Sequence, residues 1–562
     1  MKIPYGESNF YKIRTENYLY VDKTAYIEQL ENQGCFNILL RPRRFGKSLF
    51  LSTLRYYYDI RFQKEFDILF SGLSIGERPT PLKNRYQMLF MDFSGIITDD
   101  INTVRQGFDH AVKTELVDFL ESYNYPDRAM QRIEEQTSAA ALMKTFFKVI
   151  KGEKIYILID EYDHFANAVL GEDLNLYQDI VGKGGFVRSF YETIKTGTRE
   201  GVVDRFLITG VTSITLDSLT SGFNIGENIS HHRDFHQSIG FTLEETENIV
   251  QPLNEECSLE KNALMNDLKR WYNGYLFSED NRGRVFNADM VLYFIKNFNL
   301  ETCRYPKKML DSNIASDYRK ITRFFSIGDS DRNYQVLEEL LTLGQITAEY
   351  KDKLDIIKDF DRDDFVTLLF YMGFITIQGT ELEETVFAIP NHVIRQLYFE
   401  YFKKEIEQRS QIAIDSGRLK KAVRELALHG DISPLAEEIE QVLALLSNRD
   451  FMRMDEKHIK TLILTLLYQS KVYYIKSEHE VNKRYPDILL LERNPTKVKY
   501  QFLFELKYCK KKDGARGWQA KKEEGVRQVE EYLRLEEIQG LAQLKAYLLL
   551  TDGSALEVFA VG

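Results

Sequence analysis

The chain has 562 residues, too many for a single hydrophobic core, and its length predicts about three or four domains. Its 74 Lys and Arg residues against 85 Asp and Glu residues give a net charge of −11, with 44% hydrophobic and 28% charged residues. This composition is typical of a folded protein, and it excludes both intrinsic disorder and a uniformly basic nucleic-acid coat. Any nucleic-acid site must therefore be local.

The four cysteines, Cys35, Cys257, Cys303 and Cys509, are scattered, with no CxxC pair and no histidines at ligand spacing. Neither a disulfide framework nor a zinc site is expected. The first ten residues lack the apolar core of a signal peptide, and no segment approaches the roughly 18 apolar residues of a membrane span. We expect a cytoplasmic protein without a membrane partner.

Residues 1–240 alternate short apolar runs with helical patterns. Four of the runs are expected to be buried strands: Phe36–Leu40, Gln87–Phe93, Ile155–Ile159 and Phe206–Thr209. Because a parallel sheet buries both of its faces, this alternation predicts a parallel sheet sandwiched by helices.

The middle of the chain is mostly helical, with a lid expected over residues 241–300 and a connector over residues 301–450. Two β-like runs in the connector, Phe374–Ile377 and Thr385–Ile389, predict a winged-helix-like unit. Its expected wing carries three acids: Glu381, Glu383 and Glu384. Acids at that position repel phosphates, so a role in packing is favoured over DNA recognition.

Residues 451–562 are expected to form a second compact α/β unit. Its expected elements are a helix, three strands, a helix and a strand: Glu456–Gln469, Val472–Ile475, Asp487–Leu491, Lys499–Leu506, Gln519–Leu533 and Leu544–Leu550. The fold class of the whole chain is therefore α/β multidomain.

A phosphate-binding loop is indicated where RPRRFGKS, residues 41–48, follows the first strand and precedes a helical pattern. Strand, tight loop and helix form the context of a P-loop, in which helix N-terminal amides bind phosphate oxygens. Gly46 lets the backbone approach the phosphates, Lys47 would reach the β and γ phosphates, and Ser48 would ligate Mg²⁺. This pattern predicts a site for ATP.

The loop departs from the full GxxxxGK[ST] spacing at its first position, where Arg41 replaces glycine. The replacement removes the residue that most easily adopts a positive φ and makes nucleotide affinity less secure. Arg43 and Arg44 could compensate with positive charge beside the phosphates. The alternative, that both arginines are merely solvated, stays open from the sequence.

The partner of this loop is IYILIDEYDHFAN, an apolar strand that ends in Asp160 and Glu161. Asp160 would hold Mg²⁺ opposite Ser48, and Glu161 would polarise the attacking water. The plainer alternative is a helix N-cap followed by a surface acid. Two such motifs after two buried strands, about 110 residues apart, favour the nucleotide-hydrolysing interpretation.

The strand RFLITG ends in Thr209, where a neighbouring strand of such a sheet would present a polar group to the γ phosphate. A strand-end threonine is structural about as often, so both interpretations remain. Arg188, Arg205 and Arg233 are candidate arginine fingers among which one sequence cannot choose.

A second site is indicated in the last unit, where Asp487 opens a strand and YQFLFELKY carries Glu505 and Lys507. Strand alternation places Glu505 and Lys507 on one face, and a paired hairpin brings Asp487 to the same face. Two carboxylates and one ammonium suit Mg²⁺ and the hydrolysis of a phosphodiester. An ordinary exposed hairpin with a Glu and Lys face is the alternative.

Further residues support this second site less strongly. Glu480 would add an acidic metal ligand, and Gln528 on the following helix could touch the site. From Lys507 to Arg527 the chain carries eight Lys and Arg residues against three acids, with Trp518 among them. A solvated loop is the usual explanation of such a run, but beside a carboxylate cage it favours a nucleic-acid backbone.

The motifs resemble those of bacterial AAA-ATPase-like proteins with a C-terminal PD-(D/E)XK nuclease-like domain, over nearly the whole chain. The segments that carry the resemblance are YVDKT, RPRRFGKS, LIDEYD, FLITGVTSI and WYNGYLF, at residues 20–24, 41–48, 158–163, 206–214 and 271–277. In this family RPRRFGKS looks like the usual form of the loop, so Arg41 departs only from P-loops in general. Pro486, Asp487, Glu505 and Lys507 resemble the PD-(D/E)XK pattern itself.

The resemblance and the residues together favour an ATPase whose nucleotide cycle controls a Mg²⁺-dependent nuclease acting on DNA or RNA. One alternative is a signalling or scaffolding NTPase whose last domain only binds nucleic acid or protein. Another is a nucleotide switch that binds ATP without hydrolysing it. AAA-type machines often form rings, so a homo-oligomer is a further expectation.

Overall fold

The computed structural model describes residues 2–170, 173–182, 184–215, 223–257, 259, 261–280, 283–319, 321–351, 354, 360–446, 455–477 and 486–562. The chain divides into two compact units. The first comprises Met1–Cys303, Lys308–Asn333 and Thr347–Asn391; the second comprises Arg304–Lys307, Tyr334–Ile346 and His392–Gly562. The finer division into parts ending at residues 240, 300 and 450 stays a prediction.

The first unit is built on a five-stranded sheet of order β2-β3-β4-β1-β5, in which every pairing is parallel. Its strands are β1 (Phe36–Leu40), β2 (Gln87–Asp92), β3 (Ile155–Asp160), β4 (Val203–Gly210) and β5 (Glu227–Asn228). The parallel sheet predicted from the alternating pattern is thereby confirmed. All six residues of β3 are buried, as expected of a strand covered on both faces.

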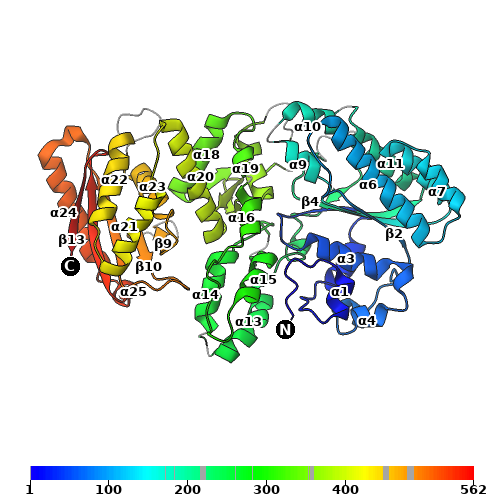
Figure 1. The fold of residues 1–562 in the computed structure, drawn as a ribbon, viewed down its shortest axis with the longest axis horizontal. Coiled ribbons are helices and arrows are strands. Elements are labelled where there is room, and N and C mark those ends of the chain that lie inside the picture. Colours follow the sequence, from blue (N-terminus) through cyan, green and yellow to red (C-terminus); the bar gives the residue numbers. More distant parts are fainter. Residues whose placement is uncertain are drawn as a thin grey trace. The chain divides into compact units, whose positions relative to one another are not determined.

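Helices cover both faces of this sheet (Figure 1). On one face lie α1 (Phe10–Thr15), α3 (Lys47–Tyr58) and α4 (Phe66–Phe70), and on the other lie α6 (Ile101–Ser122), α7 (Asp127–Glu134) and α11 (Phe186–Arg199). The unit also contains α2 (Ala25–Asn32), η1 (Ile60–Phe62), α5 (Ser74–Glu77), α8 (Ala139–Val149), α9 (His164–Leu170), α10 (Leu174–Val181) and η2 (Arg233–Phe235).

The sequence of α6 explains why it packs on the sheet. Val104, Phe108, Val112 and Leu116 recur every four residues, so they form one apolar stripe, and all four are fully buried. Asp100 starts the helix, because its side chain accepts from the backbone N–H groups of the second and third helical residues.

The helical segment of the first unit contains α13 (Leu243–Cys257), α14 (Lys261–Tyr272), α15 (Ala288–Asn297), α16 (Ser312–Arg319) and α17 (Ile321–Phe324). Cys257 at the end of α13 forms a disulfide with Cys303, and their Cα atoms lie 5.5 Å apart. The expectation of no disulfide was wrong for this pair. Their sequence separation of 46 residues gives no sign that the end of α13 meets the loop after α15.

The remaining elements of the connector are α18 (Ser330–Leu343), β6 (Gln345–Ala348), α19 (Arg362–Tyr371), β7 (Thr376–Glu381) and β8 (Glu384–Ala388). β7 and β8 pair as an antiparallel hairpin with Leu382 and Glu383 at its tip, both at positive φ. Leu382 is 94% exposed. The hairpin occupies the predicted wing, whereas a winged-helix unit as such stays a prediction.

The second unit contains a five-stranded sheet of order β13-β12-β11-β10-β9, in which only β11 and β12 pair in parallel. The strands are β9 (Tyr474–Ser477), β10 (Ile488–Leu491), β11 (Gln501–Tyr508), β12 (Leu544–Thr551) and β13 (Leu556–Val561). The predicted element order is present, with β13 as an additional edge strand.

In the second unit α24 (Gly514–Tyr532) lies on one side of the sheet, and α21 (Ser416–His429), α22 (Ser433–Leu446) and α23 (Glu456–Leu467) lie on the other (Figure 1). The unit also contains α20 (His392–Ser410), η4 (Lys511–Asp513) and α25 (Glu536–Gln539). Within the described ranges of both units, no helix has the length and apolar character needed to cross a membrane.

Candidate active sites

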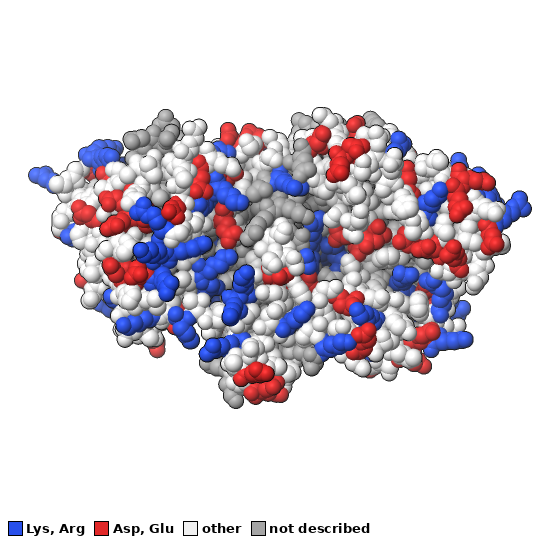
Figure 2. Space-filling view, viewed as in Figure 1, with Lys and Arg blue, Asp and Glu red and all other residues white. Residues whose placement is uncertain are grey.

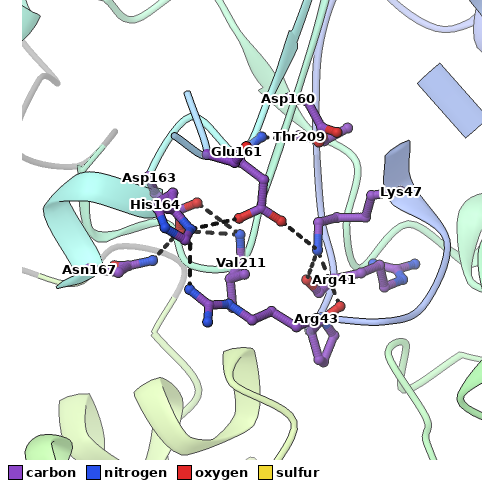
Figure 3. Close-up of polar contacts among 12 residues, drawn as sticks. Arg41, Arg43, Lys47, Asp160, Glu161, Asp163, His164, Asn167, Thr209 and Val211 are labelled. Atoms are coloured by element: carbon purple, nitrogen blue, oxygen red, sulfur yellow. Dashed lines mark hydrogen bonds and ion pairs between the residues drawn. The ribbon is translucent and has the colours of Figure 1, made fainter. Parts of the chain in front are cut away.

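The loop between β1 and α3 has the backbone form of a phosphate-binding loop. Gly46 takes φ 107° directly before α3, with open space where a Cβ would stand, and Arg44 takes φ 70°. The left-handed positions therefore fall at residues 44 and 46, so a glycine at position 41 is not required. Lys47 is buried and donates to the carbonyl oxygens of Arg41 and Pro42 at 3.0 and 3.2 Å (Figure 3).

Arg41 stabilises the base of this loop from within the core. It is 1% exposed and donates to the carbonyl oxygens of Leu40, Ser230 and Phe235 at 2.6 to 3.0 Å. Its guanidinium lies 4.4 Å from the ring centre of Phe277, and burial lowers its pKa to about 9. Arg41 thus connects the loop to the segment before the lid, and the WYNGYLF segment contributes the ring.

Asp160 ends β3 beside the phosphate loop, because the carboxyl ends of parallel strands lie at one edge of the sheet. The hydroxyl of Thr209, at the end of β4, donates to Asp160 Oδ1 at 2.6 Å. Burial raises the pKa of Asp160, and hydrogen bonds from Ser48 and Thr209 oppose the shift. Ser48 and Asp160 therefore converge, while Thr209 is fully buried behind the carboxylate.

Glu161 lies among three nitrogen-bearing side chains (Figure 3). Its carboxylate oxygens lie 3.9 Å from Lys47 Nζ and 3.4 Å from His164 Nδ1, and Arg43 Nη2 lies 3.3 Å from the same His164 nitrogen. Burial alone would raise the pKa of Glu161, but the charges of Lys47 and Arg43 and the contact with His164 lower it to about 2. The carboxylate is therefore ionised at neutral pH and can accept hydrogen bonds.

The sequence did not single out His164, although it follows Glu161 by three residues and begins α9. Asp163 was also missed as a contact. It is fully buried and accepts from the backbone N–H groups of Val211 and Thr212 and from the side chain of Asn167 (Figure 3). These bonds join the LIDEYD and FLITGVTSI segments and fix the loop that carries Glu161.

A cavity of about 450 Å³ opens from these groups within the first unit. Its polar end is lined by the phosphate loop, Asp160, Glu161 and His164. Its remaining wall includes apolar side chains from the chain start and the lid: Pro4, Leu19, Tyr20, Phe241 and Leu292. The cavity thus has one polar end and one apolar wall, and its volume lies in the range of small-molecule sites.

Two residues of the YVDKT segment have different roles: Asp22 holds the local backbone, and Lys23 lines the cavity. Asp22 accepts from the N–H and hydroxyl groups of Thr24 and Ser74, as a structural carboxylate does. Lys23 lines the cavity and forms an ion pair of 2.7 Å with Glu245 near the start of α13. Arg44 lines it as well and pairs with Asp289 at 3.3 Å.

The candidate arginine fingers are engaged elsewhere. Arg188 pairs with Glu192 at 3.0 Å, and Arg233 is an exposed neighbour of Asp234. Arg205 lies near the amino end of β4, whereas Thr209 marks the end that faces the phosphate loop.

A second charged cluster lies where β10 and β11 pair. Ile488 is opposite Phe504 in the antiparallel register, which places Asp487 opposite Glu505 and on the same face. Asp487 Oδ2 accepts from the backbone N–H of Leu506 at 2.9 Å, and Lys507 Nζ donates to Glu505 Oε1 at 2.7 Å. The three predicted residues are thus brought together, and each is at most 9% exposed.

Two residues of α23 complete this cluster, and the sequence did not point to either. Lys460 Nζ lies 3.2 Å from Asp487 Oδ1, and Glu456 Oε1 lies 3.7 Å from Lys507 Nζ. They are one helical turn apart and therefore share a face. Their positions follow from the packing of α23 against β11, which no local pattern encodes. The predicted ligand Glu480 lies outside the described residues.

The electrostatics of the cluster suit a hard cation. Burial, reinforced by the charge of Asp487, raises the pKa of Glu505 to about 7. Glu505 Oε2 is buried without a hydrogen-bond partner among the described residues. An unpaired buried oxygen fits Mg²⁺, which takes oxygen ligands and keeps part of its water shell. In the same described ranges no group of three or more His, Cys, Asp or Glu side chains has metal-site geometry.

Basic side chains are found near this cluster and over α21. Lys510, Lys511, Lys512 and Arg516 are exposed directly after β11. Figure 2 shows further Lys and Arg side chains over the part of the second unit that carries α21, with acidic side chains among them. The exposed basic residues of α21 are Arg418, Lys420, Lys421 and Arg424. Arg418 pairs with Glu438 at 2.7 Å, while positive charge of this kind would attract a phosphate backbone.

Two regions of the chain match models of known families. A family model described as predicted AAA-ATPase matches residues 4–220, and a model of the PD-(D/E)XK nuclease superfamily matches residues 454–558. The chain joins an AAA-ATPase-like region to a PD-(D/E)XK nuclease-like region. The AAA-ATPase-like region contains the first cluster, and the nuclease-like region contains the second.

One relative is a protein of Azotobacter chroococcum mcd 1, described as an uncharacterized protein in the vnfD 5′ region. It is 29% identical to this chain over 299 residues, which are 52% of this chain and 52% of the relative. The match thus spans about half the length of either protein.

Proposed function

We propose that the AAA-ATPase-like region binds and hydrolyses ATP. The convergence of Lys47, Ser48, Asp160 and Glu161 on one cavity supports this proposal. Lys47 and the amides at the start of α3 would bind phosphate oxygens, and Arg44 would add positive charge. Ser48 and Asp160 would hold Mg²⁺, which supplies charge neutralisation. Glu161 would polarise the attacking water, and Thr209 would orient Asp160.

The nuclease-like region is proposed to hydrolyse phosphodiester bonds in DNA or RNA. Asp487 and Glu505 would hold Mg²⁺, whose chemistry is to polarise a phosphoryl oxygen. Although burial alone would lower it, Glu505 raises the pKa of Lys507. Lys507 would orient or deprotonate the attacking water. The buried, paired arrangement of Asp487, Glu505 and Lys507 carries this proposal.

Because both regions occur in one chain, we also propose that the cycle of ATP binding and hydrolysis regulates the nuclease. The lid would respond to nucleotide, because Arg44 and Lys23 line the cavity and pair with Asp289 of α15 and Glu245 of α13. A homo-oligomer and a cytoplasmic location belong to the same proposal.

One observation favours the alternative of a scaffolding NTPase with a non-cutting last domain. Lys460 already neutralises Asp487, the carboxylate that a nuclease would use for its metal. In this alternative the second unit binds nucleic acid or protein through its surface.

Cleavage assays distinguish an active nuclease from a scaffolding NTPase. Labelled single- and double-stranded DNA and RNA are incubated with the protein and Mg²⁺ or Mn²⁺, with and without ATP. We expect cleavage that Asp487→Asn abolishes, and persistent absence of cleavage in all conditions would favour the scaffold. For the ATPase, Glu161→Gln should retain ATP binding and lose phosphate release; unchanged release would remove Glu161 from the mechanism.

A further inference from the structure

The nuclease-like cluster contains two buried ammonium groups. Lys507 follows from the sequence pattern, but Lys460 comes from α23 and contacts the other carboxylate. The side chains of both lysines are 5% exposed. A lysine is almost never buried to this extent unless it is paired, so the contact of Lys460 with Asp487 is part of how the unit is built.

The two carboxylates differ in how their oxygens are used. Asp487 Oδ2 accepts from the N–H of Leu506, and Asp487 Oδ1 faces Lys460 at 3.2 Å. Glu505 Oε1 accepts from Lys507, whereas Glu505 Oε2 has no hydrogen-bond partner in the described part of the chain. A cation therefore finds an open oxygen on Glu505, but on Asp487 it finds an oxygen that already neutralises an ammonium.

The charges of these four side chains cancel. Two carboxylates and two ammonium groups give these four side chains a net charge of zero in a buried environment, where uncompensated charge is costly. Glu456, whose side chain is 40% exposed, adds a third carboxylate at the edge of the cluster, 3.7 Å from Lys507 Nζ. A divalent cation at Asp487 would lie beside the Lys460 charge, and the two would repel one another more strongly than in water. Lys460 is thus a counter-ion that does for Asp487, without metal, what the metal would do.

We propose that Lys460 competes with the divalent cation for Asp487 and lowers the affinity of the nuclease-like site for metal. The site then fills only at cation concentrations well above those needed by the same two carboxylates without this counter-ion. The inference rests on the proposed metal site at Asp487 and Glu505, and it adds a residue of α23 that restricts loading of that site.

The test is calorimetric titration of the full chain, without nucleotide, with Mn²⁺ and with Mg²⁺. Lys460→Met keeps the apolar stem and removes the charge, so we expect at least tenfold tighter binding of metal than in the parent. Lys457→Met is the matched control, because Lys457 lies on the same helix but is exposed. It removes the same charge away from Asp487 and should leave the affinity unchanged. Asp487→Asn removes a proposed metal ligand, so its titration gives the heat signal that remains without metal binding at this site.

Each outcome has a distinct meaning. If Lys460→Met binds metal no more tightly than the parent while the parent still differs from Asp487→Asn, the competition is refuted and the metal site stands. If parent, Lys460→Met and Asp487→Asn titrate alike, the metal site itself is refuted. Lys460→Gln, which retains a donor to Asp487, serves if the methionine variant does not fold. We also expect Mn²⁺ to raise the thermal stability of Lys460→Met and of Lys460→Gln more than it raises that of the parent.

Discussion

At the scale of single residues, the hydroxyl of Thr209 has a defined task. It donates to Asp160, and Asp160 shares this corner of the cavity with Ser48. In Thr209→Val the buried carboxylate loses a donor, which costs about 1 kcal/mol and corresponds to roughly fivefold in affinity. We expect that loss for Mg²⁺-ATP and a smaller loss for ATP alone, measured by titration with a fluorescent ATP analogue.

Thr215→Val is the matched control for this experiment. Thr215 is equally buried, and its hydroxyl has no hydrogen-bond partner within the described ranges. The control should bind Mg²⁺-ATP as the parent does. If Thr209→Val lost equal affinity for ATP with and without Mg²⁺, the hydroxyl would act on the nucleotide and not through Asp160 and the metal.

His231 makes the stability of the first unit dependent on pH. It is buried beside Arg41, its Nδ1 lies 2.8 Å from the carbonyl oxygen of Phe277, and burial lowers its pKa to about 4. Because the unfolded chain binds this proton near pH 6.5, stability falls as the pH drops from about 6.5 to 4, by up to about 3 kcal/mol. His231→Asn should reduce this dependence in thermal unfolding from pH 4 to 7, while His236, whose pKa burial also lowers to about 4, keeps its share. A stability curve parallel to that of the parent would refute the role of His231.

The sequence predicted the chemistry of individual residues where a local motif carried it. Asp160 ends β3 and Glu161 follows it, while Lys47 and Ser48 begin the helix after β1. Their convergence follows from the geometry of a parallel sheet. Residues that join a site from a separately packed helix, such as Lys460, leave no such pattern. Arg41 was expected to make nucleotide affinity less secure, and this stays a prediction; its side chain is buried in contacts that hold the loop in place.

At the scale of elements, the approach of α24 to β11 and β12 depends on Gly525. A Cβ at this position would lie 2.4 Å from Leu548 Cδ1 and 3.1 Å from Lys507 Cγ. Gly525→Ala gains about 1 kcal/mol of helix propensity but overpacks a buried contact at a cost of about 1–3 kcal/mol. We expect a small net loss of thermal stability together with tighter metal binding, because displacement of Lys507 weakens its ion pair with the Glu505 carboxylate.

Gly540→Ala is the control at this scale. Its Cβ would meet only ordinary contacts, at 3.8 Å or more, so stability and metal binding should remain as in the parent. Metal binding by Gly525→Ala that equals the control would mean that the helix position does not matter to the cluster.

The order of the elements was predictable to a large extent, since buried strands, helix starts and the β10–β11 hairpin all have local patterns. The short β5 was not predicted, because two residues carry no periodicity. β13 was also missed, since its half-exposed residues lack the continuous apolar run of a buried strand. The Cys257–Cys303 disulfide depends on the packing of distant segments, which only the folded chain specifies.

At the scale of the whole molecule, the account requires two chemically separate sites in one chain. The first uses Lys47 and the AAA-ATPase-like region, and the second uses Lys507 and the nuclease-like region. Since each lysine contacts only the groups of its own cluster in the contacts described above, replacing one should leave the chemistry of the other intact.

The most direct measurement is therefore a paired assay of phosphate release from ATP and Mg²⁺-dependent nicking of nucleic acid by the parent, Lys47→Ala and Lys507→Ala. We predict that Lys47→Ala loses at least a hundredfold in ATP turnover. Lys507→Ala should keep parental ATP turnover and lose nicking. Loss of ATP turnover in a folded Lys507→Ala protein, or nicking that survives in it at the parental rate, would contradict the account.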